Sequence, residues 1–213
     1  MNRKADKQLS TPEYSRADVD IVGNKRSFDG FFAIDTLTLR HKRFDGRWTG
    51  EFTRELFERG EAVCVLLYDP DKDCVVLAEQ FRIGSLADER SPWLLELVAG
   101  MVEPGESYED VAARETEEEA GCAFYKLIPI CNYWVSPGGT SERVQLYCGL
   151  INSEGVGGTH GLEEENEDIR LHTLSFEQAY GAVESGEINN AATIMALQWL
   201  KIHQAELITE KAE

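Results

Sequence analysis

The sequence predicts a mixed α+β domain in which helices cover both faces of a sheet, an α/β/α sandwich, preceded by a small N-terminal strand region. Apolar, strand-like segments and segments with helical periodicity follow one another along most of the chain. Serine and glycine residues stand at the ends of two helical segments, where caps are needed. The 213 residues, 42% apolar and 28% charged, are enough for one domain with a substantial core.

The N-terminal part is expected to contain few strands. Residues 1–20 are polar and without clear periodicity, so we expect a loose terminus. The segment 31–41, FFAIDTLTLRH, alternates over its second half and predicts a strand. The segment 49–60, TGEFTRELFERG, follows the turn FDGRW and predicts a second strand or a charged connector.

The central part reads as a series of buried strands. EAVCVLLYD and CVVLAEQFRI flank the turn PDKD and predict a largely buried hairpin. PWLLELVAG predicts one further apolar strand that ends at Gly100. More strands are expected in FYKLIPICNYWV, RVQLYCGLI and IRLHTL, whereas NSEGVGGTHGLEEENED predicts a long acidic loop.

Three segments predict helices. The first begins at Ser107, has Asp110 as a weak capping-box partner, and stops at Gly121. The second has the capping pattern SFEQ and stops at Gly186. The last, NNAATIMALQWLKIHQAELI, places apolar residues at three- and four-residue spacing.

The bulk composition excludes several function classes. A formal net charge of −18 argues against a nucleic-acid or anionic-membrane surface, which would need a basic face. No apolar run approaches the roughly 20 residues needed to cross a bilayer, and the N-terminus lacks an apolar signal-peptide core, so we expect a cytoplasmic protein. The five cysteines are dispersed, which favours small buried thiols over disulfides or zinc ligands.

The acidic segment ETEEEAG is the main candidate for chemistry. On a helix, Glu115, Glu118 and Glu119 fall within an arc of about 100°. Their mutual repulsion weakens the helix by a few tenths of a kcal/mol per pair, and Arg114 is the one basic residue beside them. One alternative is a solvated acidic face; the other is a site where Mg²⁺ turns the repulsion into coordination.

The surrounding spacing favours the metal site. The segment fits the pattern G-x5-E-x7-R-E-U-x-E-E-x-G-U, in which U is a bulky aliphatic residue. The matching positions are Gly100, Glu106, Arg114, Glu115, Glu118, Glu119, Gly121 and Cys122. Thr116 departs from the pattern, and we expect this to alter only the packing behind the helix. The segment resembles the Nudix box, which implies a Nudix fold with a mixed sheet.

The resemblance extends beyond the box to the bacterial ADP-ribose pyrophosphatases. Segments similar to that subfamily are RGEAVCVLLYD, EQFRIG, PWLLELVAGMVEPGES, SPGGTSE, HGLEEENEDIRLH and NAATIMALQWL. The resemblance implies Mg²⁺-dependent hydrolysis of the diphosphate of ADP-ribose to AMP and ribose 5-phosphate. It also implies two or three Mg²⁺ ions, with Mn²⁺ as an alternative.

The same resemblance implies a metal-ligand set and a catalytic base. The ligands are the backbone carbonyl of Ala99 and the carboxylates of Glu115, Glu118, Glu119 and Glu167, with Glu118 acting through water or as support. Glu165 matches the proposed base; choosing it over Glu163 or Glu164 rests on the resemblance alone. Without the resemblance, the loop GLEEENED could be an ordinary solvated loop. Arg114 is expected to pair with box carboxylates, and Glu106 to be structural.

Substrate contacts are implied more widely. The candidate substrate-binding residues are Phe31, Phe32, Arg54, Glu55, Arg59, Arg82, Met101, Ser136, Pro137, Gly138 and Glu142. Each has a simpler alternative: SPGGTSE is also a tight turn, Arg82 a surface ion pair, and Phe31 and Phe32 core residues. The resemblance places Arg82 near the diphosphate or terminal ribose, Glu142 on the terminal-ribose side, and the N-terminal residues at the adenosine of a partner subunit.

The domain prediction follows from these assignments. We expect a strand region at residues 1–57 that forms a homodimer and a Nudix domain at residues 58–213. Two rival functions stay open. One is a pyrophosphatase for another nucleotide sugar such as GDP-mannose, and the other is a non-catalytic ADP-ribose-binding sensor. The complete box and the lack of a basic extension favour an enzyme.

Overall fold

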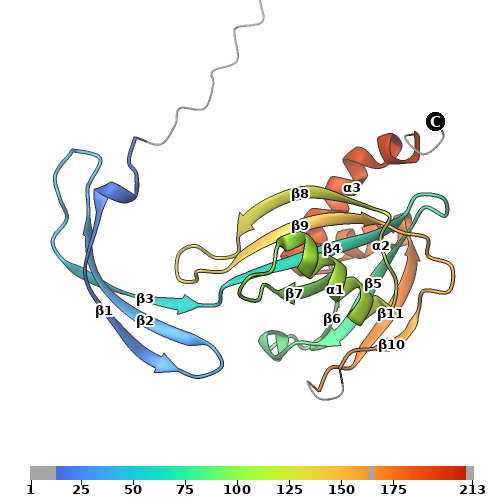
Figure 1. Cartoon of the computed structure of the whole chain (residues 1–213), viewed down its shortest axis with the longest axis horizontal. Coiled ribbons are helices and arrows are strands. Elements are labelled where there is room, and N and C mark those ends of the chain that lie inside the picture. Colours follow the sequence, from blue (N-terminus) through green and yellow to red (C-terminus); the bar gives the residue numbers. More distant parts are fainter. Residues whose placement is uncertain (1–12, 163–165, 210–213) are drawn as a thin grey trace, which may run out of the picture. The chain divides into compact units, whose positions relative to one another are not determined.

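The computed structural model describes residues 13–162 and 166–209, and the chain forms two compact units (Figure 1). The smaller comprises Met1–Arg59 together with Ser136–Ser141. The larger comprises Gly60–Val135 and Glu142–Glu213. The predicted domain boundary between residues 57 and 58 lies close to this division, although the loop 136–141 groups with the smaller unit.

The smaller unit is built on an antiparallel sheet. A short 3₁₀ helix, η1 (Arg16–Asp18), leads into β1 (Val19–Asp29), β2 (Ala33–His41) and β3 (Phe52–Glu58), in the order β1-β2-β3. The loop 136–141 joins the edge of β3, since Phe57 N–H donates to Gly139 O and Ser141 N–H donates to Phe57 O. The predicted strand at 49–60 is therefore confirmed, and the connector alternative is wrong.

Strand β1 was not predicted from the sequence. Residues 1–12 lie outside the described residues, but residues 19 and 20, expected in a loose terminus, begin an eleven-residue strand. Most side chains of β1 are polar and exposed, and bulges between Ile21 and Gly23 and between Arg26 and Phe28 interrupt its alternation. Both features remove the period-two signal by which a half-buried strand is found in a sequence.

The larger unit contains a mixed sheet, which in the described residues has the strand order β10-β11-β5-β4-β9-β8. Its strands are β4 (Glu61–Asp69), β5 (Cys74–Phe81), β6 (Trp93–Glu96), β7 (Val98–Met101), β8 (Lys126–Trp134), β9 (Arg143–Leu150), β10 (Gly158–His160) and β11 (Ile169–Ser175). β4 and β9 run parallel and the other pairs are antiparallel. β10 lies within the segment predicted to be a loop throughout, and its Gly-rich sequence gave no strand signal.

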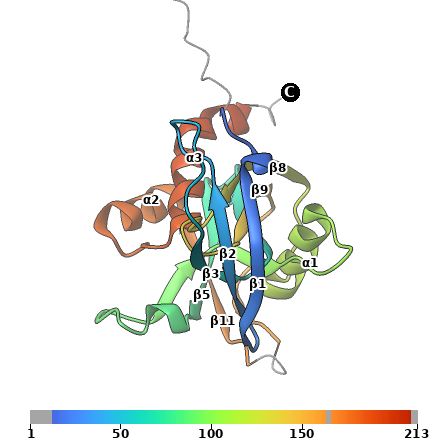
Figure 2. The same cartoon turned by 90° about the vertical axis from the view of Figure 1, so that its left-hand side faces the viewer.

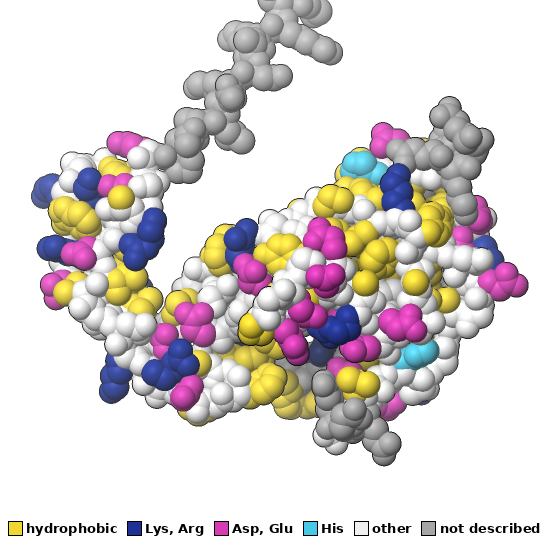
Figure 3. Space-filling model, in the orientation of Figure 1, with side chains coloured by type: hydrophobic (Ala, Val, Ile, Leu, Met, Phe, Trp, Pro, Cys, Tyr) yellow, Lys and Arg dark blue, Asp and Glu magenta, His cyan; other side chains and the backbone are white. Residues whose placement is uncertain are grey.

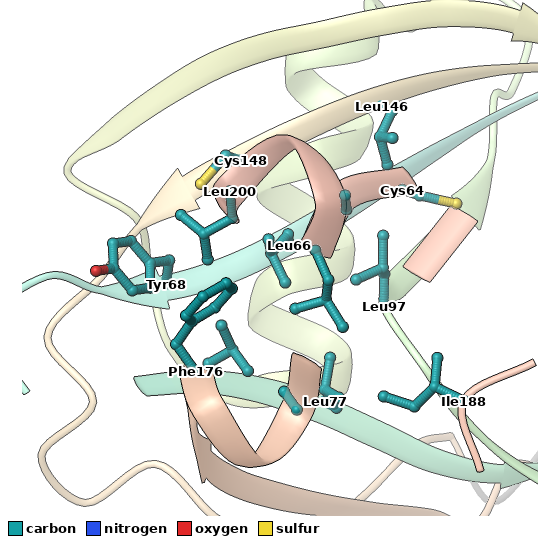
Figure 4. Packing of buried hydrophobic residues seen from close by; sticks show 14 of the residues in the cluster. Cys64, Leu66, Tyr68, Leu77, Leu97, Leu146, Cys148, Phe176, Ile188 and Leu200 are labelled. Carbon is teal, nitrogen blue, oxygen red and sulfur yellow. The ribbon is translucent and has the colours of Figure 1, made fainter. Parts of the chain in front are cut away.

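Helices cover both faces of this sheet (Figure 2). α1 (Tyr108–Ala120) packs on one face, where Val111 and Ala112 join a core cluster with alternate residues of β4 and β5. α2 (Phe176–Ser185) and α3 (Ala191–Thr209) pack on the other, with Phe176 and Leu200 beside Leu66 and Leu77 (Figure 4). The central strands are apolar throughout because both of their faces are buried. The predicted α/β/α sandwich is confirmed.

The helix ends follow their predicted caps. Ser107 accepts a hydrogen bond from the N–H of Asp110 while the Asp110 carboxylate accepts one from the N–H of Ser107, a complete capping box. Ser175 and Gln178 form the same arrangement at α2. Gly121 ends α1 in the left-handed conformation (φ 59°), which glycine adopts without a steric cost. None of the helices in the described part of the chain is long and apolar enough to span a membrane.

The predicted single strand PWLLELVAG is two strands, so this prediction was wrong. β6 pairs with β5, β7 pairs with β4, and Leu97 lies between them. The cause is the course of β4 and β5, which pair only near their turn, from Leu67 and Val76 to Asp69 and Cys74. Beyond that point the segment 93–101 fills the space between them. The apolar sequence of this segment contains no signal that its first half pairs with one strand and its second half with another.

The prediction of buried thiols holds for three of the five cysteines. Cys64, Cys74 and Cys148 are buried, Cys122 is half-buried and Cys131 is exposed, and all five are free thiols. Cys131 stands at a bulge in β8, where the register with β9 shifts between Pro129 and Cys131. The bulge turns a residue of an apolar segment outward.

A buried aspartate closes the β4–β5 hairpin. Oδ1 of Asp69 accepts hydrogen bonds from the backbone N–H groups of Asp71 and Lys72, at 2.9 and 3.3 Å. Its Oδ2 accepts from the N–H and the hydroxyl of Ser153, at 2.8 and 2.7 Å. Burial by itself raises the pKa of this carboxyl, but the four donors outweigh it and hold the pKa below its usual range.

We predict that Asp69→Asn destabilises the protein by about 1–3 kcal/mol, because one amide NH₂ would then face two donors. The depressed pKa means that the stabilisation by Asp69 is present above the pKa of the unfolded chain and is lost as pH falls through the folded-state pKa. Urea unfolding at pH 7 and pH 3 measures both effects. Ser153→Ala, which removes one donor, should cost less; an Asp69→Asn variant as stable as the original would contradict the prediction.

Candidate active site

Glu115 lies across the strand that leads into the box. A Cβ atom at Gly100 of β7 would overlap the Glu115 carboxylate, so the glycine is required for this side chain to lie where it does. Burial raises the pKa of Glu115, and Arg114 opposes that rise. The first glycine of the motif is therefore explained by the space that the Glu115 carboxylate occupies.

Arg114 forms ion pairs with three carboxylates of the box, those of Glu106, Glu115 and Glu118. Its Nε donates to Glu106 Oε1 at 3.0 Å, and its Nη1 lies 2.6 Å from Glu115 Oε1 and 3.2 Å from Glu118 Oε2. Its Nη2 reaches Glu106 Oε2 at 3.2 Å and the carbonyl oxygen of Met101 at 3.4 Å. Figure 3 shows acidic side chains gathered around basic ones over the region of α1. The contacts expected of Arg114 and Glu106 are present.

Glu119 is the buried carboxylate of the group. Its side chain points at β7, where Oε2 accepts a hydrogen bond from Ala99 N–H at 3.0 Å, and the residue is only 3% exposed. Burial raises the pKa of Glu119 to about 8; the Ala99 N–H lowers it, and the charges of Glu115 and Glu167 raise it further. The ionised form of Glu119 is therefore disfavoured, because the positive charge near its carboxylate is too small to compensate for burial.

The acidic loop contributes Glu167. The backbone N–H of Glu167 donates to Leu162 O at 3.1 Å, and its Oε2 accepts from Leu162 N–H at 3.4 Å. Glu167 is close enough to Glu115 and Glu119 for its charge to raise the pKa of both. Glu165, the predicted base, and its neighbours Glu163 and Glu164 lie outside the described residues.

The residues present fit a hard divalent cation. The donors are carboxylate oxygens and the Ala99 peptide, the ligand types that Mg²⁺ takes. The pKa of Glu119 is raised mainly by burial and further by the charges of Glu115 and Glu167, and a bound cation would offset both effects. In the side-chain positions of residues 13–162 and 166–209, no group of three or more acidic, histidine or cysteine side chains already converges on one point. Arg114 and Ala99 N–H hold the carboxylates instead.

Comparison with known proteins agrees with this geometry. A model of the NUDIX domain matches residues 58–213. ADP-ribose pyrophosphatase of Escherichia coli (strain K12) is 48% identical over 199 residues, which cover 93% of this chain and 95% of that protein. The chain belongs to the NUDIX family. The prediction of a Nudix hydrolase is confirmed.

Two further comparisons are more distant. GDP-mannose pyrophosphatase of Pectobacterium atrosepticum is 32% identical over 181 residues, covering 84% of this chain and 92% of that protein. A solved structure titled as a crystal structure of an ADP compounds hydrolase has a TM-score of 0.65, covering 88% of this chain and 97% of that chain at 19% identity. This last likeness concerns the fold.

Thr116, the departure from the Nudix pattern, is fully buried behind the helix. Its hydroxyl donates to the carbonyl oxygen of Ala112 one turn earlier, at 2.6 Å. The hydroxyl therefore has a partner inside the core, and the carboxylate face is unaffected. The expected effect, a change of packing alone, agrees with this position.

Several predicted substrate residues belong to the larger unit. Nε of Arg82 donates to Glu96 Oε2 at 2.5 Å. Arg82 and Glu96 also lie close enough to Cys64 in β4 for their charges to affect the pKa of its thiol, as do Glu119 and Glu142. Burial and these carboxylates raise the pKa of the Cys64 thiol to about 12, so it stays protonated at neutral pH. Met101, at the end of β7, is half-exposed.

Glu96, the ion-pair partner of the candidate substrate residue Arg82, was not singled out by the sequence analysis. It lies in β6, on the segment that bridges β4 and β5, and it orients the guanidinium of Arg82. The available signal was a single acidic residue in the apolar run WLLELVAG. A lone charge among buried residues needs a partner, and here the partner, Arg82, directly follows the neighbouring strand β5.

The other predicted substrate residues belong to the smaller unit. Phe32 packs edge-on against Phe57, with their ring centroids 5.3 Å apart. The guanidinium of Arg59 lies 4.4 Å from the ring centroid of Phe32. Phe31 is 88% exposed, so the core alternative does not hold for it. Arg54 and Glu55 are exposed on β3. Ser136, Pro137 and Gly138 form the loop beside that strand, and Ser136 O accepts from the N–H groups of Gly139 and Thr140, as in a tight turn.

We predict that Glu119→Gln raises the stability of the metal-free protein at pH 7–9. The folded state holds the Glu119 proton up to about pH 8, whereas the unfolded chain releases it near its ordinary value. The contribution of Glu119 to stability therefore falls as pH rises between these values. Urea unfolding in EDTA, compared at pH 5 and pH 9, should show a gap between variant and original that widens with pH. A constant gap would contradict the assignment.

Proposed function

We propose that this Nudix protein hydrolyses the diphosphate of ADP-ribose to AMP and ribose 5-phosphate with the help of bound Mg²⁺. The observation that carries the proposal is the complete set of box carboxylates, with Glu119 buried beside Ala99 and short of positive charge. Similarity to the E. coli ADP-ribose pyrophosphatase over almost the whole chain supports the choice of substrate. The proposal includes a homodimer, inferred from the family resemblance, and a cytoplasmic location, inferred from the sequence, in which no apolar run is long enough to cross a membrane.

The proposed metal ligands are the Ala99 carbonyl and the carboxylates of Glu115, Glu119 and Glu167, with Glu118 as an outer ligand. Two or three Mg²⁺ ions, or Mn²⁺ in their place, would offset a local excess of negative charge. When bound, they supply charge to the phosphoryl oxygens and lower the pKa of a bound water. Arg114 keeps Glu115 and Glu118 in place from the solvent side, which limits the reorganisation on metal binding.

The chain itself performs the proton transfer and holds the substrate. We assign Glu165 as the base that takes the proton of the attacking water. Arg82, oriented by Glu96, presents a planar donor suited to diphosphate or ribose oxygens. Glu142 is proposed at the terminal ribose, and Met101 is proposed to bind substrate. Phe31, Phe32, Arg54, Glu55, Arg59, Ser136, Pro137 and Gly138 are proposed to bind substrate by resemblance.

A substrate panel tests the reaction class and the substrate together. ADP-ribose, GDP-mannose and ADP-glucose are incubated with the protein and Mg²⁺, and phosphate is measured after treatment of the products with phosphatase. We expect ADP-ribose to be hydrolysed fastest, with activity abolished by EDTA. A preference for GDP-mannose would favour the second pyrophosphatase class, to which the 32% identity points. Binding of ADP-ribose without phosphate release would indicate a sensor.

The base assignment is tested by Glu165→Gln, with Glu163→Gln and Glu164→Gln as matched controls from the same loop. Loss of a general base costs roughly 10²–10⁴ in rate. We expect kcat of Glu165→Gln to fall in this range with little change in Mg²⁺ dependence, while the controls keep most of their activity. Near-normal turnover of Glu165→Gln, or a larger loss in a control, would remove Glu165 from this role.

A further inference from the structure

The last residue of β10 rests on the end of the box helix. A Cβ atom at Gly121, the C-cap of α1, would lie 2.8 Å from Cε1 of His160 and 3.5 Å from its Nδ1. The imidazole is fixed on its other side, because Nε2 lies 3.0 Å from the carbonyl oxygen of Gly157. Gly121 thus has a second requirement besides its positive φ: the ring occupies the space that a side chain would take.

Gly161 and Leu162, the two residues after His160, both lie against Glu167. In the β10–β11 hairpin, His160 lies opposite Ile169, two residues after Glu167. Gly161 follows His160 with a φ of 103°, and a Cβ there would lie 2.8 Å from Glu167 Cβ and 3.0 Å from its carbonyl oxygen. Leu162 and Glu167 also exchange hydrogen bonds: Glu167 N–H donates to Leu162 O, and Leu162 N–H donates to the Glu167 carboxylate. A displacement of His160 would therefore move Glu167.

The hairpin partner of His160 shows on which side of the sheet its side chain lies. Ile169 is fully buried in the core cluster that also contains Val111, Ala112 and Ala120 of α1. His160, opposite Ile169, faces the same helix. Glu115 and Glu119 project from the last turns of that helix, directly before Gly121. The ring of His160 thus packs between α1, which carries Glu115 and Glu119, and the loop that carries Glu167.

We propose that His160, seated on Gly121, is a positioning residue that sets the Glu167 carboxylate against Glu115 and Glu119 for metal binding. It touches neither substrate nor metal and acts through Glu167. The inference rests on the proposed metal site. It explains why the motif glycine is followed forty residues later by a histidine that contacts it. A histidine that only filled space would leave metal affinity unchanged when replaced.

The test is a double-mutant cycle read by Mn²⁺ binding, measured by EPR on the full chain. We expect His160→Ala and Glu167→Gln each to weaken Mn²⁺ affinity about tenfold, as the loss of groups that support a metal site does. The double variant should be no more than about twofold weaker than Glu167→Gln, because His160 acts through that residue. Losses that multiply, or unchanged affinity in a folded His160→Ala variant, would overturn the proposal.

A second variant approaches the contact from the helix. Gly121→Ala places a methyl group against the ring, and Gly186→Ala is its matched control: it also caps a helix at positive φ (79°), but its nearest neighbour is the Arg90 Nη1 atom at 3.9 Å. Both should lose thermal stability, and only Gly121→Ala should lose Mn²⁺ affinity. Equal Mn²⁺ affinity in the two variants would count against the proposal.

The same measurements separate this proposal from the proposed function. Absence of Mn²⁺ binding by the unmodified chain would overturn the metal site and this proposal together. A preserved non-additive cycle in a protein that does not hydrolyse ADP-ribose would support the positioning role and overturn the proposed substrate alone.

Discussion

Glu119 keeps its carboxylate against the backbone N–H of Ala99 in a place that solvent hardly reaches. A single peptide donor compensates only part of the cost of burying a charge, and Glu115 and Glu167 add to that cost instead of reducing it. A carboxylate buried in this way needs a positive charge beside it, and under the proposed function an exchangeable metal cation supplies that charge. Gly100, by leaving room for Glu115, and Arg114, by holding the outer carboxylates, both serve to keep this negative group assembled.

The sheet provides the place for that group because β4 and β5 separate. Paired only near their turn, they leave a gap that the segment 93–101 fills by pairing first with one and then with the other. The first half carries Glu96, which orients Arg82, and the second half carries the Ala99 peptide that holds Glu119. The change of partner at Leu97 thus brings together the cationic and the anionic sides of the site.

Signals between neighbouring residues in the sequence predicted the helices and their ends correctly. Features that depend on residues far apart in the chain could not be predicted from such signals. The caps at Ser107, Gly121 and Gly186 depend on neighbouring residues, so the helices could be placed from the sequence. The course of 93–101 depends on strands elsewhere in the chain, and β1 carries too few apolar residues to give a period. The helical spacing placed Glu115 and Glu119 together but could not tell that Glu119 is buried and Glu118 exposed, which depends on β7. The resemblance supplied Glu167, for which spacing gave no argument.

Electrostatics connects the acidic composition with the choice of substrate. Arg114 is bound to Glu106, Glu115 and Glu118, and Arg82 to Glu96, so both of these guanidinium groups are matched by carboxylates in the free protein. A free diphosphate, which is an anion, would meet a surface that remains negative. A diphosphate arriving with divalent cations brings the charge that Glu119 lacks. Under the proposed function, the site therefore selects the metal complex of its substrate by charge, before any contact with the nucleoside or the sugar is made.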